Sequence, residues 1–170
     1  MRRGALLALA LLATAPGCRR EEASGKLKTL DEILSSKDDN DPRLDRDFQD
    51  LSPETKRLFR LKYRALPRQR RNDRGTIVYL LGLNLRSAED WEFLREVVNE
   101  PPCLSLADCA KPGAVSMGDE VTLAYPALVA LRQAARSRGG AEGEAVRVLQ
   151  AAKDSKMPAV GRMVSRLEQE

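Results

Sequence analysis

A series of apolar residues at helical spacing, bounded by start and stop signals, constrains the fold of this chain more than any other feature. Ser52 has the chemistry of an N-cap, and Pro53 follows it at the first helical position. Leu58 and Leu61 have the spacing of one helix face, and Pro67 ends the pattern. The sequence therefore predicts a helix from residue 53 to about residue 66.

Further segments repeat this pattern. Residues 75–85, GTIVYLLGLNL, are almost wholly apolar and suit a buried strand or a buried helix, and we favour a helix because the neighbouring segments are helical. The sequence Ser87-Ala88-Glu89-Asp90 is close to a capping box and predicts the start of a helix that ends before Pro101. More helical patterns follow at 121–131, 142–153 and 158–168.

The composition agrees with a helical fold, since Leu, Ala, Arg and Glu dominate and aromatic residues make up 4%. We therefore predict an all-α chain of helices paired as hairpins. Residues 142–168, EGEAVRVLQAAKDSKMPAVGRMVSRLE, resemble one HEAT-like repeat, because a helix is followed by a second, shorter helix. The resemblance implies a short α-solenoid. No strict period recurs along the chain, so an irregular helical bundle remains an alternative.

The N-terminus has the pattern of an export signal. Met1-Arg2-Arg3 precedes the apolar run GALLALALLATA at residues 4–15, which is too short to cross a bilayer as a transmembrane helix. The run leads into TAPGC, residues 14–18, and Gly17-Cys18 after an apolar run resembles the lipobox of bacterial lipoproteins. The resemblance implies a signal peptide over residues 1–17 and lipidation of Cys18, with acyl chains such as palmitate anchoring an aqueous domain to the membrane.

Two alternatives to this anchor remain. Ordinary cleavage after a small residue would give a soluble secreted or periplasmic protein, or Cys18 could be an incidental cysteine. In a Gram-negative host the lipoprotein resemblance implies the outer membrane, because Arg19 stands where the common inner-membrane retention signal has Asp.

The chain after the predicted signal peptide divides into two parts that differ in composition. Residues 18–51 predict a lipid-anchored polar tether followed by an acidic loop, and residues 52–170 predict the helical domain. EEASGK, residues 21–26, is expected to be flexible, whereas LKTLDEILSS, residues 27–36, suits one short helix. Residues 37–50 are acidic and rich in turn formers.

Cys103 and Cys109 are expected to form a disulfide. A zinc site normally needs four ligands, the chain contains no histidine, and a CxxC redox motif has two intervening residues where this pair has five. If Cys18 carries lipid, two thiols remain in an oxidising compartment, where disulfides persist. Positions six apart on a straight helix are about 9 Å apart along its axis, beyond the reach of a disulfide. The segment CLSLADC is therefore predicted as a non-helical loop that the disulfide closes as a structural staple.

The chain lacks residues that several classes of function require. Without histidine the chain cannot hold a Ser-His-Asp or Cys-His catalytic set or a His-ligated zinc, and neither common glycine-rich phosphate loop occurs. No carboxylate pair has a spacing that demands hydrolase chemistry, so we predict no enzyme, no cofactor and no metal. The net charge of +4 includes Arg2 and Arg3 of the signal, so the mature chain is near +2 and nucleic acid is not expected as a partner.

We expect a non-enzymatic module that binds or scaffolds a protein partner of the cell envelope on a flat or concave face of paired helices. The alternative is binding of anionic lipid, lipopolysaccharide or an envelope polymer through the basic segment 56–74, which holds nine Lys or Arg and one acid. Its candidate contacts are Lys56, Arg60, Arg64, Arg68, Arg70 and Arg71.

Simpler interpretations stand beside these binding sites. The basic segment could be a solvated face, or it could pair with residues 31–50, which hold eight acids and three bases. Trp91, Phe93 and Leu94 could form a partner-binding patch, but such a cluster on a helix is more often part of the core.

Overall fold

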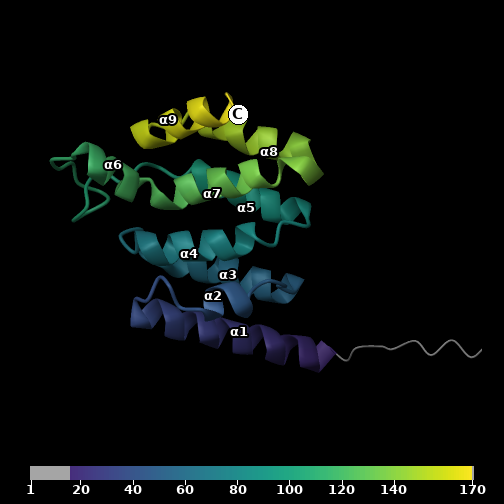
Figure 1. Ribbon diagram of the computed structural model, residues 1–170. Coiled ribbons are helices and arrows are strands. Elements are labelled where there is room, and N and C mark those ends of the chain that lie inside the picture. Colours follow the sequence, from purple (N-terminus) through teal and green to yellow (C-terminus); the bar gives the residue numbers. More distant parts are fainter. Residues whose placement is uncertain (1–15, 170) are drawn as a thin grey trace, which may run out of the picture.

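The computed structural model of the protein describes residues 16–169 (Figure 1). The expected signal sequence before Pro16 lies outside these residues. Every regular element in the described part is a helix, which confirms the all-α fold class. The helices are α1 Pro16–Ser36, α2 Arg43–Arg46, α3 Pro53–Ala65, α4 Arg71–Gly82, α5 Ala88–Val98, α6 Met117–Leu123, α7 Tyr125–Arg136, α8 Arg138–Ala152 and α9 Pro158–Leu167.

The helices stack on one another in the order of the chain. Figure 1 shows α1 at one end of the stack and α9 at the other. α1 packs against α3, α4 packs against α7, and α5 packs against both α7 and α8, while α9 contacts α7 and α8. One cluster of buried apolar residues runs through the stack from Leu30 in α1 to Leu167 in α9. This arrangement is compatible with a helical bundle or with a short helical repeat.

Two helices begin at the capping residues that the sequence indicates. The backbone N–H of Thr55 donates to the Ser52 hydroxyl at 3.2 Å, which satisfies one of the free donors at the start of α3. The backbone N–H of Ser87 donates to the Asp90 carboxylate at 3.0 Å at the start of α5. The predictions of helices after Ser52 and after Ser87 are therefore confirmed.

The apolar segment 75–85 is largely helical, as predicted, but its helix begins earlier. α4 starts at Arg71, within the basic segment 56–74, and ends at Gly82. The first turn is stabilised by the buried side chains of Arg71 and Arg74, which bond to residues 100–106. No local pattern reveals these contacts.

Two glycines allow α7 to approach the backbone of α4. A Cβ on Gly82 would lie 2.6 Å from the Cβ of Gln133, and a Cβ on Gly75 would lie 2.5 Å from Cδ1 of Tyr125. The two glycines are seven residues apart, about two helical turns, so they share one face of α4. Because glycine has no Cβ, side chains of α7 fill the space where one would stand.

The prediction of a flexible tether is wrong for residues 21–26, because they belong to α1. This helix runs from Pro16 to Ser36. Ala23 and Leu30 are fully buried and Leu34 is nearly so, at spacings that place all three on one helix face. That face packs on α3. Polar residues occupy the rest of the helix, so its composition resembles that of a tether.

The folded part therefore begins before Ser52. Residues 37–51 form turns and the short helix α2, and they bury Leu44, Phe48 and Leu51 in the same core as α3. Asn84 fixes this segment, because its Nδ2 donates to Phe48 O at 2.9 Å and its Oδ1 accepts from Leu51 N–H at 3.0 Å. These partners are 36 and 33 positions away in the sequence, beyond the reach of a local pattern.

Candidate partner-binding surface

Cys103 and Cys109 form a disulfide, as predicted, in a segment that is not helical. Their Cα atoms are 4.1 Å apart, a separation that a disulfide can bridge. Within the loop, the backbone N–H of Leu104 donates to Cys109 O at 3.1 Å, and the Ser105 hydroxyl donates to Asp108 O at 2.8 Å. The loop is therefore held by a covalent bond and by hydrogen bonds of its own.

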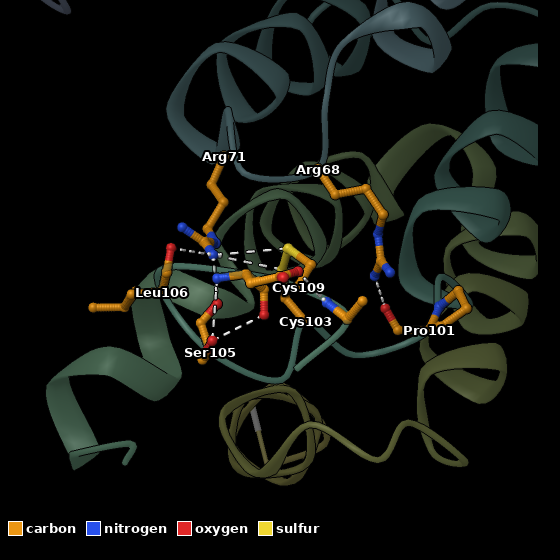
Figure 2. Close-up of a disulfide and its surroundings, with 9 residues drawn as sticks. Arg68, Arg71, Pro101, Cys103, Ser105, Leu106 and Cys109 are labelled. Carbon is orange, nitrogen blue, oxygen red and sulfur yellow. Dashed lines mark hydrogen bonds between the residues drawn. A yellow bond between two sulfur atoms is a disulfide. The ribbon is translucent and has the colours of Figure 1, made fainter. Parts of the chain in front are cut away.

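Two arginines hold this loop from outside (Figure 2). Arg71 Nη2 donates to the carbonyl oxygens of Ser105 at 2.9 Å and Leu106 at 3.2 Å, and it lies 3.5 Å from Cys103 Sγ. Arg68 donates to Pro101 O. Two residues of the predicted basic site therefore anchor this part of the chain, because Arg71 holds the disulfide loop and Arg68 holds Pro101, two residues before it.

Exposed apolar side chains are concentrated in and after this loop. Among the described residues, eight large apolar side chains are exposed, and six of them lie between residues 104 and 125. We call residues 104–125 the apolar projection, because Figure 1 shows this part of the chain, with α6, extending to one side of the stack. The six side chains are Leu104, Leu106, Val115, Met117, Val121 and Tyr125.

The rest of the predicted basic site does not form one exposed face. Lys56 is buried, and its Nζ lies 2.7 Å from Asp90 Oδ2. Arg60 is buried as well, and its Nη1 lies 3.1 Å from Asp90 Oδ1. Further ion pairs of the basic segment are Arg64 with Glu96, Arg70 with Asp73 and Lys62 with Asp31. Asp90 and Glu96 of α5 supply most of these partners, whereas Asp31 is the one acid among them from residues 31–50, where the sequence predicted the pairing.

Asp90 is the centre of this buried charge cluster. Desolvation by burial raises its pKa, but hydrogen bonds from Lys56 and from the backbone of Arg86 and Ser87, together with the Lys56 charge, outweigh this effect. The pKa of Asp90 therefore lies below its ordinary value, and the carboxylate is ionised at neutral pH. Because its side chain is 2% exposed, the carboxylate joins α3 to α5 and does not face a ligand.

The aromatic cluster on α5 belongs to the core. Trp91, Phe93 and Leu94 are at most 5% exposed. The Phe93 ring meets the Tyr63 ring edge-on, with centroids 5.1 Å apart, a favourable aromatic geometry. The core interpretation is confirmed, and these residues cannot form an exposed partner-binding patch.

The apolar projection is the site that sequence patterns miss. The helical pattern over 121–131 predicts one apolar face, whereas the structure ends α6 at Leu123 and leaves Val121 49% exposed. Leu104 and Leu106 are the sequence feature that indicates this site, because a closed loop as short as this one has little interior in which to bury two leucines.

The described residues contain neither a metal cluster nor a membrane span. Among them, no three Cys, Asp or Glu side chains come together in a group that could hold a metal ion. None of the helices in this part of the chain combines the length and apolar character needed to cross a membrane. The backbone of Cys18 belongs to the first turn of α1, but its side chain lies outside the description, so lipidation there stays a prediction.

No protein-family model, no curated protein and no solved structure matches the chain.

Proposed function

We propose that this protein is an exported lipoprotein of the cell envelope that acts as a non-enzymatic protein-binding or scaffolding module. Lipidation at Cys18 would anchor it, at the outer membrane if the host is Gram-negative, and a soluble periplasmic or secreted form is the alternative. The disulfide between Cys103 and Cys109 supports an exported location, because disulfides persist in oxidising compartments and are rare in the cytosol.

The observation that carries the binding role is the apolar projection. Scattered exposed apolar side chains are normal on soluble proteins, but here six of eight fall within 22 consecutive residues, 104 to 125. A partner that covers them with its own apolar side chains removes both surfaces from water. Burial of this kind stabilises a complex by about 25 cal/mol per Å² of apolar surface, before the entropic cost of association.

The projection is also held in a way that favours binding. The disulfide closes its first part, and Arg71 ties two carbonyls of the loop to α4. Its second part is α6, where the backbone N–H of Asp119 donates to the Ser116 hydroxyl at 3.2 Å and caps the helix. A backbone that is already fixed loses less conformational entropy on binding than a free loop.

Site-specific photo-crosslinking in the producing cells tests this role. A photoreactive side chain at Leu106, Met117 or Val121 is expected to give one discrete adduct with a second protein. The matched control is Val146 of α8, which is 51% exposed but lies outside the projection. The binding role is wrong if Val146 gives the same adduct, if the three test positions give none, or if the adduct has twice the mass of the chain and so is a self-dimer.

Intact-mass analysis of protein extracted from membranes tests the anchor. The expected species begins at Cys18 and carries the added mass of acyl chains. The variant Cys18→Ser is expected to lose that mass and to move to the soluble fraction. An unacylated mature chain in the membrane extract would exclude the lipoprotein proposal.

Binding of anionic lipid, lipopolysaccharide or an envelope polymer through the basic segment has less support. Lys56 and Arg60 are buried, and neighbouring carboxylates neutralise them together with Arg64. Exposed basic side chains attract a charged membrane surface by about 1 kcal/mol each, but a buried or paired side chain does not contribute in this way. Protein binding is therefore the function that we retain.

A further inference from the structure

A narrow cleft lies between the arginines that hold the disulfide loop and the loop itself. Arg68, Arg71 and Arg74 line it, together with Cys103 and residues of α6 and α7. Figure 2 shows Arg71 extending to the disulfide loop and Arg68 extending to Pro101, which precedes the loop. The cleft contains about 320 Å³ of space between atoms, part of it open to solvent, and only a small part is wide enough for a water molecule.

This cleft carries an excess of positive charge. Among the described residues that line it, Glu100 is the one carboxylate, and its Oε1 lies 2.6 Å from Arg74 Nη2. Arg71 bonds to carbonyl oxygens and contacts disulfide sulfur atoms, neither of which carries a negative charge. Burial, and then the nearby charge of Arg68, lower the pKa of Arg71. Three guanidinium groups thus face one carboxylate.

Two guanidinium donors in this cluster have no acceptor in the described part of the chain. The Nε atoms of Arg71 and Arg74 are buried without a hydrogen-bond partner there. The two residues are 8% and 5% exposed, so most of each side chain is removed from bulk water. An unsatisfied buried N–H is destabilising, and an acceptor with a negative charge would relieve it most effectively.

We infer that the cleft binds the carboxylate of an acidic side chain that the protein partner presents next to its apolar residues. This inference rests on the proposed function and gives the partner a chemistry. A carboxylate oxygen is about as large as a water molecule, so it fits the part of the cleft that admits water, and guanidinium groups donate to a carboxylate in pairs. Cys103 and Leu123 line the cleft and belong to the loop and helix that carry the exposed apolar side chains, so one acidic, apolar segment can reach both.

Titration of the full mature chain with acetate, an isolated carboxylate, tests this site. Arginine Nε–Hε resonances are followed by NMR at constant ionic strength while acetate is raised to about 100 mM, a range that covers millimolar affinity. The resonances of Arg71 and Arg74 are expected to shift and to saturate. Arg57, an exposed arginine paired with Glu54, is the internal control and should not shift. Acetamide, which has a similar shape without the charge, should have no effect.

Variants of Arg68 complete the test, because this arginine is less buried than the other two. Arg68→Gln should weaken acetate binding about tenfold, the equivalent of one charge-assisted hydrogen bond, and Arg68→Lys should restore part of the affinity. Unchanged circular dichroism of both variants checks the fold. The site is overturned if no saturable shift appears, if acetamide acts equally, or if Arg68→Gln binds as wild type does.

The titration and the crosslinking fail independently of each other. Acetate binding involves no partner, so its absence would remove the carboxylate site while an adduct at Met117 still supported protein binding. A saturable acetate shift without any adduct would overturn the partner's part in the inference and leave a site for free carboxylates.

Discussion

The Asp90 carboxylate accepts hydrogen bonds from the Lys56 and Arg60 side chains of α3 and from the backbone N–H groups of Arg86 and Ser87, at 2.7–3.1 Å. Its side chain is 2% exposed, and the two cations that it neutralises are buried with it. Removal of this one charge would leave Lys56 in the interior without a counterion, and would leave Arg60 with the exposed Glu89 carboxylate alone, 3.3 Å from its Nη2. Such an unpaired buried charge is among the most destabilising local changes in a protein.

Asp90→Asn is therefore expected to lower the free energy of unfolding by about 3–5 kcal/mol at neutral pH. The difference in the free energy of unfolding between Asp90→Asn and the wild type should become smaller at acidic pH. Because the pKa of Asp90 is depressed in the folded state, its stabilising contribution is complete above the unfolded pKa, near 3.9, and is lost as the pH falls through the folded value. Urea unfolding of both proteins at neutral pH and at about pH 3 measures this change.

Glu54→Gln is the matched control, because Glu54 pairs with Arg57 on the exposed side of the same helix. Exposed pairs contribute little, so its urea curve should coincide with that of wild type. If Asp90→Asn lost the same free energy at both pH values, the ionised carboxylate would not be the source of the stability.

The spacing of Lys56, Arg60 and Arg64 could be read from the sequence, but the surface that they face could not. The four-residue period places the three side chains along one face of α3. Their partners Asp90 and Glu96 belong to α5, at least 30 positions away. Local periodicity therefore predicts which residues lie together on a helix, but not whether that face meets solvent or another helix.

At the scale of the helices, the contact between α4 and α7 depends on the absence of a side chain at Gly82. An added Cβ would meet the Cβ of Gln133, an atom attached directly to the α7 backbone. Gln133 itself is 3% exposed. Gly82→Ala is therefore expected to lower the free energy of unfolding by about 1–3 kcal/mol, as overpacking of a core does. Thermal or urea unfolding measures the loss.

Gly161→Ala in α9 is the control for this prediction, because a Cβ there has no heavy atom within 4 Å. Alanine is the better helix former, so this variant should stabilise the protein by up to about 1 kcal/mol. If Gly82→Ala stabilised the protein as well, the close approach of α7 to α4 would be wrong.

The disulfide loop has no regular secondary structure, so its order depends on cross-links. Replacement of both Cys103 and Cys109 by Ser should lower the free energy of unfolding by about 2 kcal/mol, the chain-entropy value for so short a loop. Because Arg71 still ties the loop to α4, hydrogen exchange should quicken at loop amides such as Leu104 and stay slow in α4. Addition of a reductant to the wild type should reproduce both effects. Exchange that quickened equally in α4 would mean that the staple supports the whole domain.

For the molecule as a whole, the sequence predicts the fold class well because capping residues, prolines and apolar spacing act within single helices. The predicted helix over 158–168, for example, corresponds to α9 Pro158–Leu167. The extent of the core is less predictable, because α1 has few apolar residues and buries them against α3. The apolar projection escapes prediction for the opposite reason, since apolar residues there are exposed.

The position of α1 also bears on the proposed anchor. Ala23, the first fully buried residue of the described part, follows Cys18 by five positions within the same helix. A lipid on Cys18 would therefore hold the helical stack directly at the membrane surface. A flexible tether over residues 21–26 would have let the domain move away from it.

Limited digestion of the folded mature chain with trypsin separates these two arrangements. Lys26 and Lys28 lie within α1, and Lys26 Nζ donates to Asp50 O at 2.7 Å, so cleavage requires this end of the stack to open. We expect cleavage at both lysines to be at least about 100-fold slower than in the denatured chain, as an opening free energy of about 2.7 kcal/mol would give. Leu30→Ala, which removes a fully buried side chain, should speed cleavage strongly, whereas Ser24→Ala on the exposed face should not. Mass spectrometry of timed samples locates the cuts. Rapid cleavage of the wild type after Lys26 and Lys28 would mean that residues 21–26 are a flexible tether after all.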